Sequence, residues 1–80
     1  MTEAPAGVRA LVQAATQRLM SAHAAEDLDD ARLQAEVLYA EAAGLDRPQV
    51  IAAGDRPADP AAAERFETLL ARREGHEPLA

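Results

Sequence analysis

One stretch, residues 31–44 with the sequence ARLQAEVLYAEAAG, constrains the fold of this chain more than any other. Its apolar residues recur at helical spacing, three on one face and two beside them: Leu33, Val37 and Ala40, then Leu38 and Ala42. Asp30 can cap the first turn, and Gly44 can close the last turn in the left-handed conformation that glycine tolerates. We therefore predict an amphipathic helix here, whose apolar face forms the centre of the core.

The N-terminal segment carries a second amphipathic stripe. Its apolar residues recur at steps of three and four positions: Val8, Leu11, Val12, Ala15, Leu19 and Ala22. The pattern predicts a helix that starts after a lead-in near Thr2 or Pro5 and ends near His23, with Arg18 largely off the stripe. His23 would then lie favourably against the negative end of the helix dipole.

A short third helix is predicted after the glycine that ends the central one. Asp46 is a suitable cap, the proline at position 48 favours a first helical turn, and Gly54 is a natural stop. Three apolar residues of this segment are expected to face the core: Leu45, Val50 and Ile51.

The fourth helix has the strongest start signal, because Asp59 supplies a capping side chain and Pro60 suits the first helical position. The helix should run to about Arg73 and end at Gly75. It should bury one small residue and three larger ones: Ala62 or Ala63, Phe66, Leu69 and Leu70. Residues 76–80 contain Pro78, and the residue before a proline disfavours the helical conformation. We therefore expect this tail to be extended.

Four acidic residues separate the first two helices: Glu26, Asp27, Asp29 and Asp30. They surround Leu28, which can fold back onto the bundle. A calcium-binding loop is excluded, because its fifth position would be Ala31 and its central glycine and final glutamate are missing. We interpret the cluster as a solvated capping loop, since negative charge is favourable at a helix N-terminus.

These patterns predict an all-α fold, a small bundle of four or five short helices over residues 1–74. The chain is rich in Ala, Leu, Glu and Arg, and no strand pattern or internal repeat is visible. It has no cysteine, so neither a disulfide nor a thiolate metal site can stabilise it. Helix packing must therefore supply the stability of a single 80-residue domain.

The charge of the chain argues against nucleic-acid binding. Its net charge is −6 and its pI is near 4.7, whereas a phosphate backbone requires a basic face. A helix-turn-helix DNA reader is disfavoured for the same reason, and the acidic surplus favours solubility or a basic partner. No stretch resembles a signal peptide or a membrane span, so we expect a cytoplasmic protein without membrane contact.

The sequence offers no catalytic, cofactor-binding or metal site. Ser21 is the only serine, and His23 and His76 lie in unrelated places. A carboxylate metal site in a bundle uses Glu-x-x-His, but here the order is reversed, from His23 to Glu26. No glycine-rich loop follows a strand, so there is no nucleotide or methyl-donor fingerprint.

Three arginines remain as candidate contact residues. Arg72 and Arg73 lie in the last turn of the fourth helix, where they can complement the helix dipole or clamp a following domain or partner. Arg32 is poorly placed for the dipole of its own helix, and it can pair instead with Asp29 or Glu36.

Three segments in order, ARLQAEVLYAEAAGLDR, VIAAGDRPADP and RFETLLARREGHEPLA, resemble the N-terminal domain of the bacterial peptide chain release factor glutamine methyltransferases. The resemblance covers residues 8–80. In that family the second helix reads Ala-Arg-Leu-Asp-Ala-Glu, and the fourth ends in paired arginines followed by Gly-Glu-Pro-Leu-Ala-Tyr-Ile. Gln34 here replaces the family's aspartate, and His76 stands where glycine is frequent.

The resemblance implies a division of labour. The family enzyme transfers a methyl group from S-adenosylmethionine to the glutamine of a release factor's Gly-Gly-Gln loop, using motifs of a later catalytic domain. The helical domain is then a substrate-recognition domain, and residues 75–80 begin the linker to the catalytic domain of the same chain. Its contacts to the release factor or that domain would involve five residues: Arg32, Arg72, Arg73, Glu77 and Pro78.

The alternative is a free-standing acidic helical interaction module with no enzyme attached. The two hypotheses differ in what the gene encodes beyond codon 80. An Asn-Pro-Pro-Tyr motif and a glycine-rich cofactor loop would identify the methyltransferase, and an in-frame stop would identify the free module.

Overall fold

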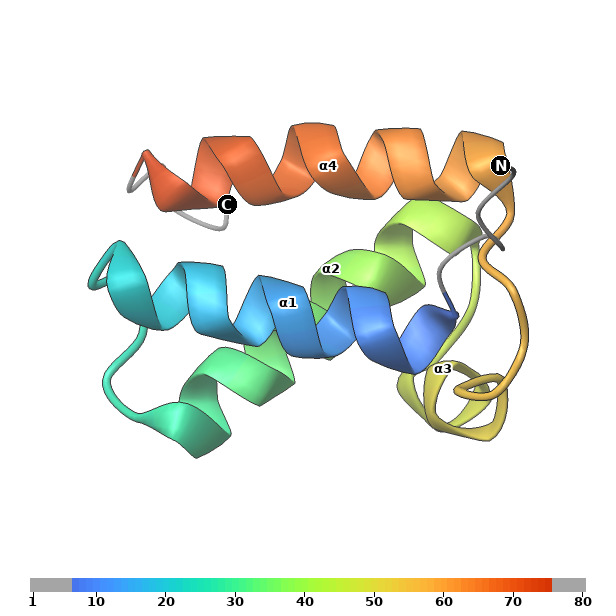
Figure 1. Ribbon diagram of the computed structural model, residues 1–80, viewed down its shortest axis with the longest axis horizontal. Helices are drawn as coiled ribbons and strands as arrows, with labels where there is room; N and C mark the ends of the chain where they lie inside the picture. The colour runs from blue at the N-terminus through green and yellow to red at the C-terminus, as the bar shows by residue number, and fades with distance from the viewer. Residues whose placement is uncertain (1–6, 76–80) are drawn as a thin grey trace, which may run out of the picture.

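The computed structural model describes residues 7–75, which form four α-helices and no strand (Figure 1). The helices are α1 (Val8–Ser21), α2 (Leu28–Ala43), α3 (Arg47–Ala52) and α4 (Pro60–Glu74). Helices α1 and α4 run in the same direction, and α2 crosses both of them obliquely (Figure 1). The predicted all-α bundle is therefore confirmed. The expected lead-in at residues 1–6 and the extended tail at residues 76–80 lie outside the described residues.

Helix α2 is the central element, because it packs against all three other helices. Half of its 16 residues are buried: Ala31, Gln34, Ala35, Glu36, Leu38, Tyr39, Ala40 and Ala42. Ala31 and Ala35 are completely buried, and such small side chains let a neighbouring helix approach closely. The expected core positions of Leu38, Ala40 and Ala42 are confirmed.

The expectation that Leu33 and Val37 lie at the centre of the core is wrong. Their exposed fractions are 42% and 43%. The buried stripe of α2 instead runs through Ala31, Ala35 and Leu38, and residues 33 and 35 lie about 200° apart around the helix axis. The prediction followed the larger side chains, Leu33 and Val37, whereas the buried face of α2 contains the two alanines Ala31 and Ala35.

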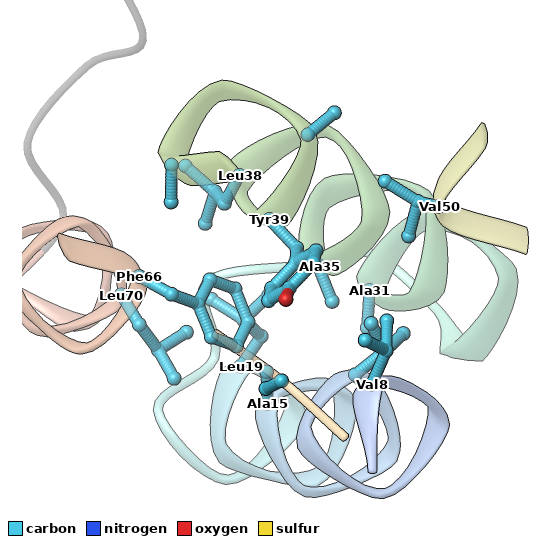
Figure 2. Close-up of a cluster of buried hydrophobic side chains, with 14 of the residues drawn as sticks. Val8, Ala15, Leu19, Ala31, Ala35, Leu38, Tyr39, Val50, Phe66 and Leu70 are labelled. Atoms are coloured by element: carbon cyan, nitrogen blue, oxygen red, sulfur yellow. The ribbon is translucent and has the colours of Figure 1, made fainter. Parts of the chain in front are cut away.

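The core fills the space between α1, α2 and α4 (Figure 2). Tyr39 of α2 and Phe66 of α4 pack edge to face, with ring centroids 5.3 Å apart and planes at 81°. The predicted stripe of α1 is confirmed at Val8, Val12, Ala15 and Leu19, whereas Leu11 and Ala22 are half-buried. The predicted face of α4 is confirmed at Ala62, Phe66 and Leu70, with Ala63 and Leu69 half-buried.

Two smaller core predictions are wrong. Leu28 does not fold back onto the bundle, and Ile51 of α3 does not face the core; each has an exposed fraction of 56%. A helix of six residues buries a narrow face, and in α3 that face is supplied by Val50 alone. Leu45, which was also expected in the core, is partly buried against it.

The helix starts follow their capping residues. In α3 and α4 the predicted caps are confirmed, since the Asp46 and Asp59 side chains accept hydrogen bonds from the backbone N–H groups of Gln49 and Ala62. The predicted cap of α2 is wrong by three residues. Asp27 is the N-cap and accepts from the Asp30 backbone N–H at 2.8 Å, so α2 begins at Leu28.

Two of the helices, α1 and α2, end with a residue in the left-handed conformation. Gly44 ends α2 with φ of 69°, as predicted. Helix α1 ends at Ser21, and His23 beyond it adopts φ of 56°, a conformation that glycine accepts more readily than histidine. The backbone N–H groups of His23 and Ala24 donate to the carbonyls of Met20 and Leu19, which completes a Schellman motif.

Within the described residues, no side chain caps the start of α1. Gly7 is the N-cap residue and offers no side chain, so the first N–H groups of the helix need acceptors from elsewhere. The backbone N–H groups of Val8 and Arg9 donate to the carbonyls of Arg56 and Gly54, each over 3.0 Å. The loop between α3 and α4 therefore caps α1 (Figure 1).

We predict that Leu38→Ala lowers the free energy of unfolding by about 2–5 kcal/mol, because the leucine is 2% exposed and its loss leaves a cavity. Leu33→Ala on the same helix is the matched control and should cost less than about 1 kcal/mol, since that side chain is 42% exposed. Urea denaturation followed by the fluorescence of Tyr39, the single tyrosine, measures both. Equal losses in the two variants would contradict this assignment of the core.

Candidate functional site

Two of the predicted contact residues, Arg32 and Arg73, lie apart in the structure. Arg32 projects from α2 towards α1 and α3, whereas Arg73 meets α2 at Gln34. Residues 32 and 34 lie about 200° apart around the helix axis, so the two arginines lie on different sides of α2. Glu77 and Pro78 lie outside the described residues.

Arg73 ties the end of α4 to the start of α2. Its Nε donates to Gln34 Oε1 over 2.7 Å, and its Nη2 lies 3.5 Å from the carbonyl of Ala24. Gln34 is 8% exposed, and its Nε2 donates to the Ala24 carbonyl and to Asp30 Oδ2. These contacts of Arg73 lie within the domain, so they leave its predicted role as a clamp on a following domain or partner untested.

Gln34 fits this network because an amide both accepts and donates hydrogen bonds. Its oxygen accepts a hydrogen bond from Arg73, and its NH2 group donates to the Ala24 carbonyl and to a carboxylate oxygen of Asp30. A carboxylate at position 34, as the resemblance expects, has no proton for these two acceptors. The departure from the family pattern is therefore accommodated by the neighbours of Gln34.

A second arginine clamp joins α1 to α4 at the same end of the bundle. Arg18 donates from Nε and Nη2 to the two carboxylate oxygens of Glu74, at 3.1 and 2.5 Å, and from Nη1 to Glu67 over 2.6 Å. These hydrogen bonds hold the pKa of Glu74 below its ordinary value. The sequence analysis missed this clamp. The available signal was the spacing of Glu67 and Glu74, which are seven residues, or about two turns, apart on α4.

A recess with three arginines, which we call the basic groove, lies where α1, α2 and α3 meet. It has a volume of about 350 Å³. Its lining comes from all three helices and the turn after α3: Val8, Arg9, Val12, Gln13, Thr16, Arg32, Glu36, Arg47, Val50, Ile51 and Gly54. Arg47 Nε donates to Glu36 Oε1 over 2.8 Å, which satisfies a glutamate side chain that is only 10% exposed.

The expected pairing of Arg32 with Asp29 or Glu36 is wrong. Glu36 accepts from Arg47 of α3 instead, and within residues 7–75 Arg32 makes no hydrogen bond or ion pair. Arg32 is exposed at the edge of the basic groove. The competing arginine comes from another helix, so spacing along α2 alone could not reveal it.

Two further recesses flank α2. The α1–α2 groove, of about 540 Å³, is continuous with the basic groove through Gln13, Thr16 and Arg32, and it contains the exposed Leu28. The third recess, of about 600 Å³, includes the exposed Leu33 and Val37 together with Gln34 and Arg73. The apolar side chains that the sequence analysis wrongly placed in the core therefore line surface recesses.

Within residues 7–75 no group of three or more His, Cys, Asp or Glu residues is arranged to hold a metal ion. None of the helices in that part of the chain has the length and apolar character needed to cross a bilayer.

Comparison with known protein families gives one match. Residues 10–80 match the family model described as the PrmC N-terminal domain. No curated protein and no solved structure was found to match the chain. The matched range contains α2, α3 and α4 and all of α1 except its first two residues.

We predict that Glu74→Gln lowers the free energy of unfolding at pH 7, and that the variant loses less stability than the wild type when the pH falls. A carboxylate with a lowered pKa in the folded state stabilises the fold above its unfolded pKa, and this stability is lost as the pH falls through the folded value. The difference between wild type and variant should therefore shrink as the pH falls below about 4.5, the ordinary pKa of the group. Urea denaturation between pH 7 and pH 3 measures this.

Glu64→Gln is the matched control for that experiment. Glu64 is an exposed acid on the same helix, and its carboxylate has no partner within residues 7–75, so the same change of charge should alter stability little. A Glu74→Gln profile that coincides with the Glu64→Gln profile would show that the Arg18 clamp does not stabilise the fold.

Proposed function

This chain belongs to the PrmC N-terminal domain family, and on that basis we propose that it is the release-factor-recognition domain of a protein-glutamine methyltransferase. The family match over residues 10–80 is the observation that carries the proposal. It agrees with the resemblance of three ordered segments to the release factor methyltransferases, which implies that this domain recognises the substrate and that another domain transfers the methyl group.

Recognition by this domain is a binding task, and its surface offers suitable features. The three recesses around α2 combine exposed leucine, valine and isoleucine side chains with arginines and carboxylates. Protein interfaces commonly combine apolar centres with such polar rims. The proposed partner is a peptide chain release factor, which acts in translation termination and therefore places the protein in the cytoplasm.

The chemistry is assigned to a catalytic domain of the same chain. That domain would bind S-adenosylmethionine and transfer its methyl group to the side-chain amide of the Gly-Gly-Gln glutamine. The helical domain would hold the release factor so that this glutamine reaches the catalytic domain. Orientation of this kind lowers the entropic cost of bringing two reactants together.

We predict that the 80-residue chain binds a bacterial release factor with a micromolar dissociation constant, as expected for a transient protein contact. Isothermal titration calorimetry of the chain into the release factor measures the affinity. The control is an acidic protein of similar size and charge that lacks a Gly-Gly-Gln loop, which should give no binding heat. Equal heats for the two proteins would mean that recognition is not the function of this domain.

We also predict that the same chain does not bind S-adenosylmethionine, because the resemblance places the cofactor loop in the later domain. A calorimetric titration with the cofactor should give only heats of dilution. A micromolar site on these 80 residues would contradict the proposed division between recognition and chemistry.

A further inference from the structure

Arg32 differs from most arginines of the domain because its donors are free. All eight basic residues of the chain are arginines. Five of them make hydrogen bonds to other residues of the bundle: Arg9, Arg18, Arg47, Arg65 and Arg73. Within residues 7–75 Arg32 makes none, and it is exposed on α2. Its guanidinium therefore keeps five N–H donors for a ligand.

The groove around Arg32 differs in charge from the molecule as a whole. It contains three arginines, of which Arg9 is paired with Asp55 and Arg47 with Glu36. Arg32 therefore carries the positive charge that no carboxylate within residues 7–75 neutralises, on a chain with a net charge of −6. The third recess has the opposite balance, with Glu26 and Asp30 against Arg73. The basic groove is therefore the recess of the three that suits an anionic ligand.

The groove also has an apolar component. Val8, Val12 and Val50 are buried beneath it, and Ile51 is 56% exposed at its side. Arg32 also borders the α1–α2 groove, where Leu28 is exposed to the same extent. A ligand that pairs with Arg32 can thus cover Ile51 or Leu28 as well.

We propose that the basic groove binds an acidic segment of the partner protein, which places one Asp or Glu carboxylate on Arg32 and an apolar side chain on Ile51. The proposal rests on the proposed function, because it names the part of the release factor that this domain would recognise. A bidentate pair between guanidinium and carboxylate is a strong and directional contact. Covering Ile51 would remove its apolar surface from water, which contributes favourably to the free energy of binding.

The same chemistry argues against a nucleic acid as the ligand. A phosphate backbone presents a run of negative charges, and a chain with a net charge of −6 would repel most of them. One carboxylate flanked by apolar residues fits a single free arginine in a shallow recess better. A protein segment is therefore the occupant that the charges favour.

The test compares two charge reversals in the 80-residue chain. Arg32→Glu should weaken binding of the release factor at least tenfold, because it replaces an attractive pair by a repulsive one. Arg56→Glu makes the same change of charge at an exposed arginine that does not line the groove and has no partner within residues 7–75. It should change the affinity less than threefold, as measured by isothermal titration calorimetry.

Neither substitution removes a side-chain hydrogen bond or ion pair within residues 7–75, and circular dichroism checks that both variants fold. Amide chemical shifts of the 15N-labelled wild-type chain give an independent location for the partner. Addition of the release factor should perturb Gln13, Ile51 and Gly54, which line the groove, more than Leu33 and Val37 on the other side of α2.

Each outcome is decisive. Equal affinities of Arg32→Glu and Arg56→Glu, or shift changes confined to Leu33 and Val37, would overturn the groove as the docking site while leaving release-factor recognition intact. Absence of any binding by the wild-type chain would instead overturn the proposed function and this inference with it. A short single-stranded RNA that binds as tightly as the release factor, and loses affinity in Arg32→Glu, would overturn the protein segment as occupant.

Discussion

The rest of the structure depends on how closely the other helices approach α2. Ala31 and Ala35 are completely buried at this contact, so the backbones of α1 and α2 can come nearer than leucine would permit. Tyr39 and Phe66 fill the wider space between α2 and α4. Because α2 packs against three helices, half of its residues are buried. Its exposed residues include Arg32 on one side and Leu33 with Val37 on another.

Arginine side chains connect the helices of this small domain outside its apolar core. Exposed ion pairs contribute little stability individually, so their main effect here is geometric. Arg18 and Arg73 fix the last turn of α4 to α1 and α2, and Arg65 Nε donates to the Ala42 carbonyl near the end of α2. Arg47 satisfies the almost buried carboxylate of Glu36. These arginines are occupied within the fold, which is why a free one in a recess is informative.

The sequence was a good guide to elements and a poor guide to contacts. The four helices, the caps Asp46 and Asp59, and the stop at Gly44 follow local rules, so they could be predicted. The orientation of α2 could not be predicted, because its fully buried residues Ala31 and Ala35 are alanines, and alanine gives a weak hydropathy signal. The partners of Arg47 and Arg73 come from other helices, and spacing along one helix contains no information about them.

The capping of α1 by the carbonyls of Gly54 and Arg56 has a consequence for the order in which the chain becomes structured. On the ribosome α1 is synthesised first, but the acceptors for its first two N–H groups follow about 45 residues later. Until they emerge, the N–H groups of Val8 and Arg9 lack these two acceptors, and Gly7 has no side chain to replace them. The start of α1 is thus completed only when the loop that leads into α4 has been synthesised and has folded against it.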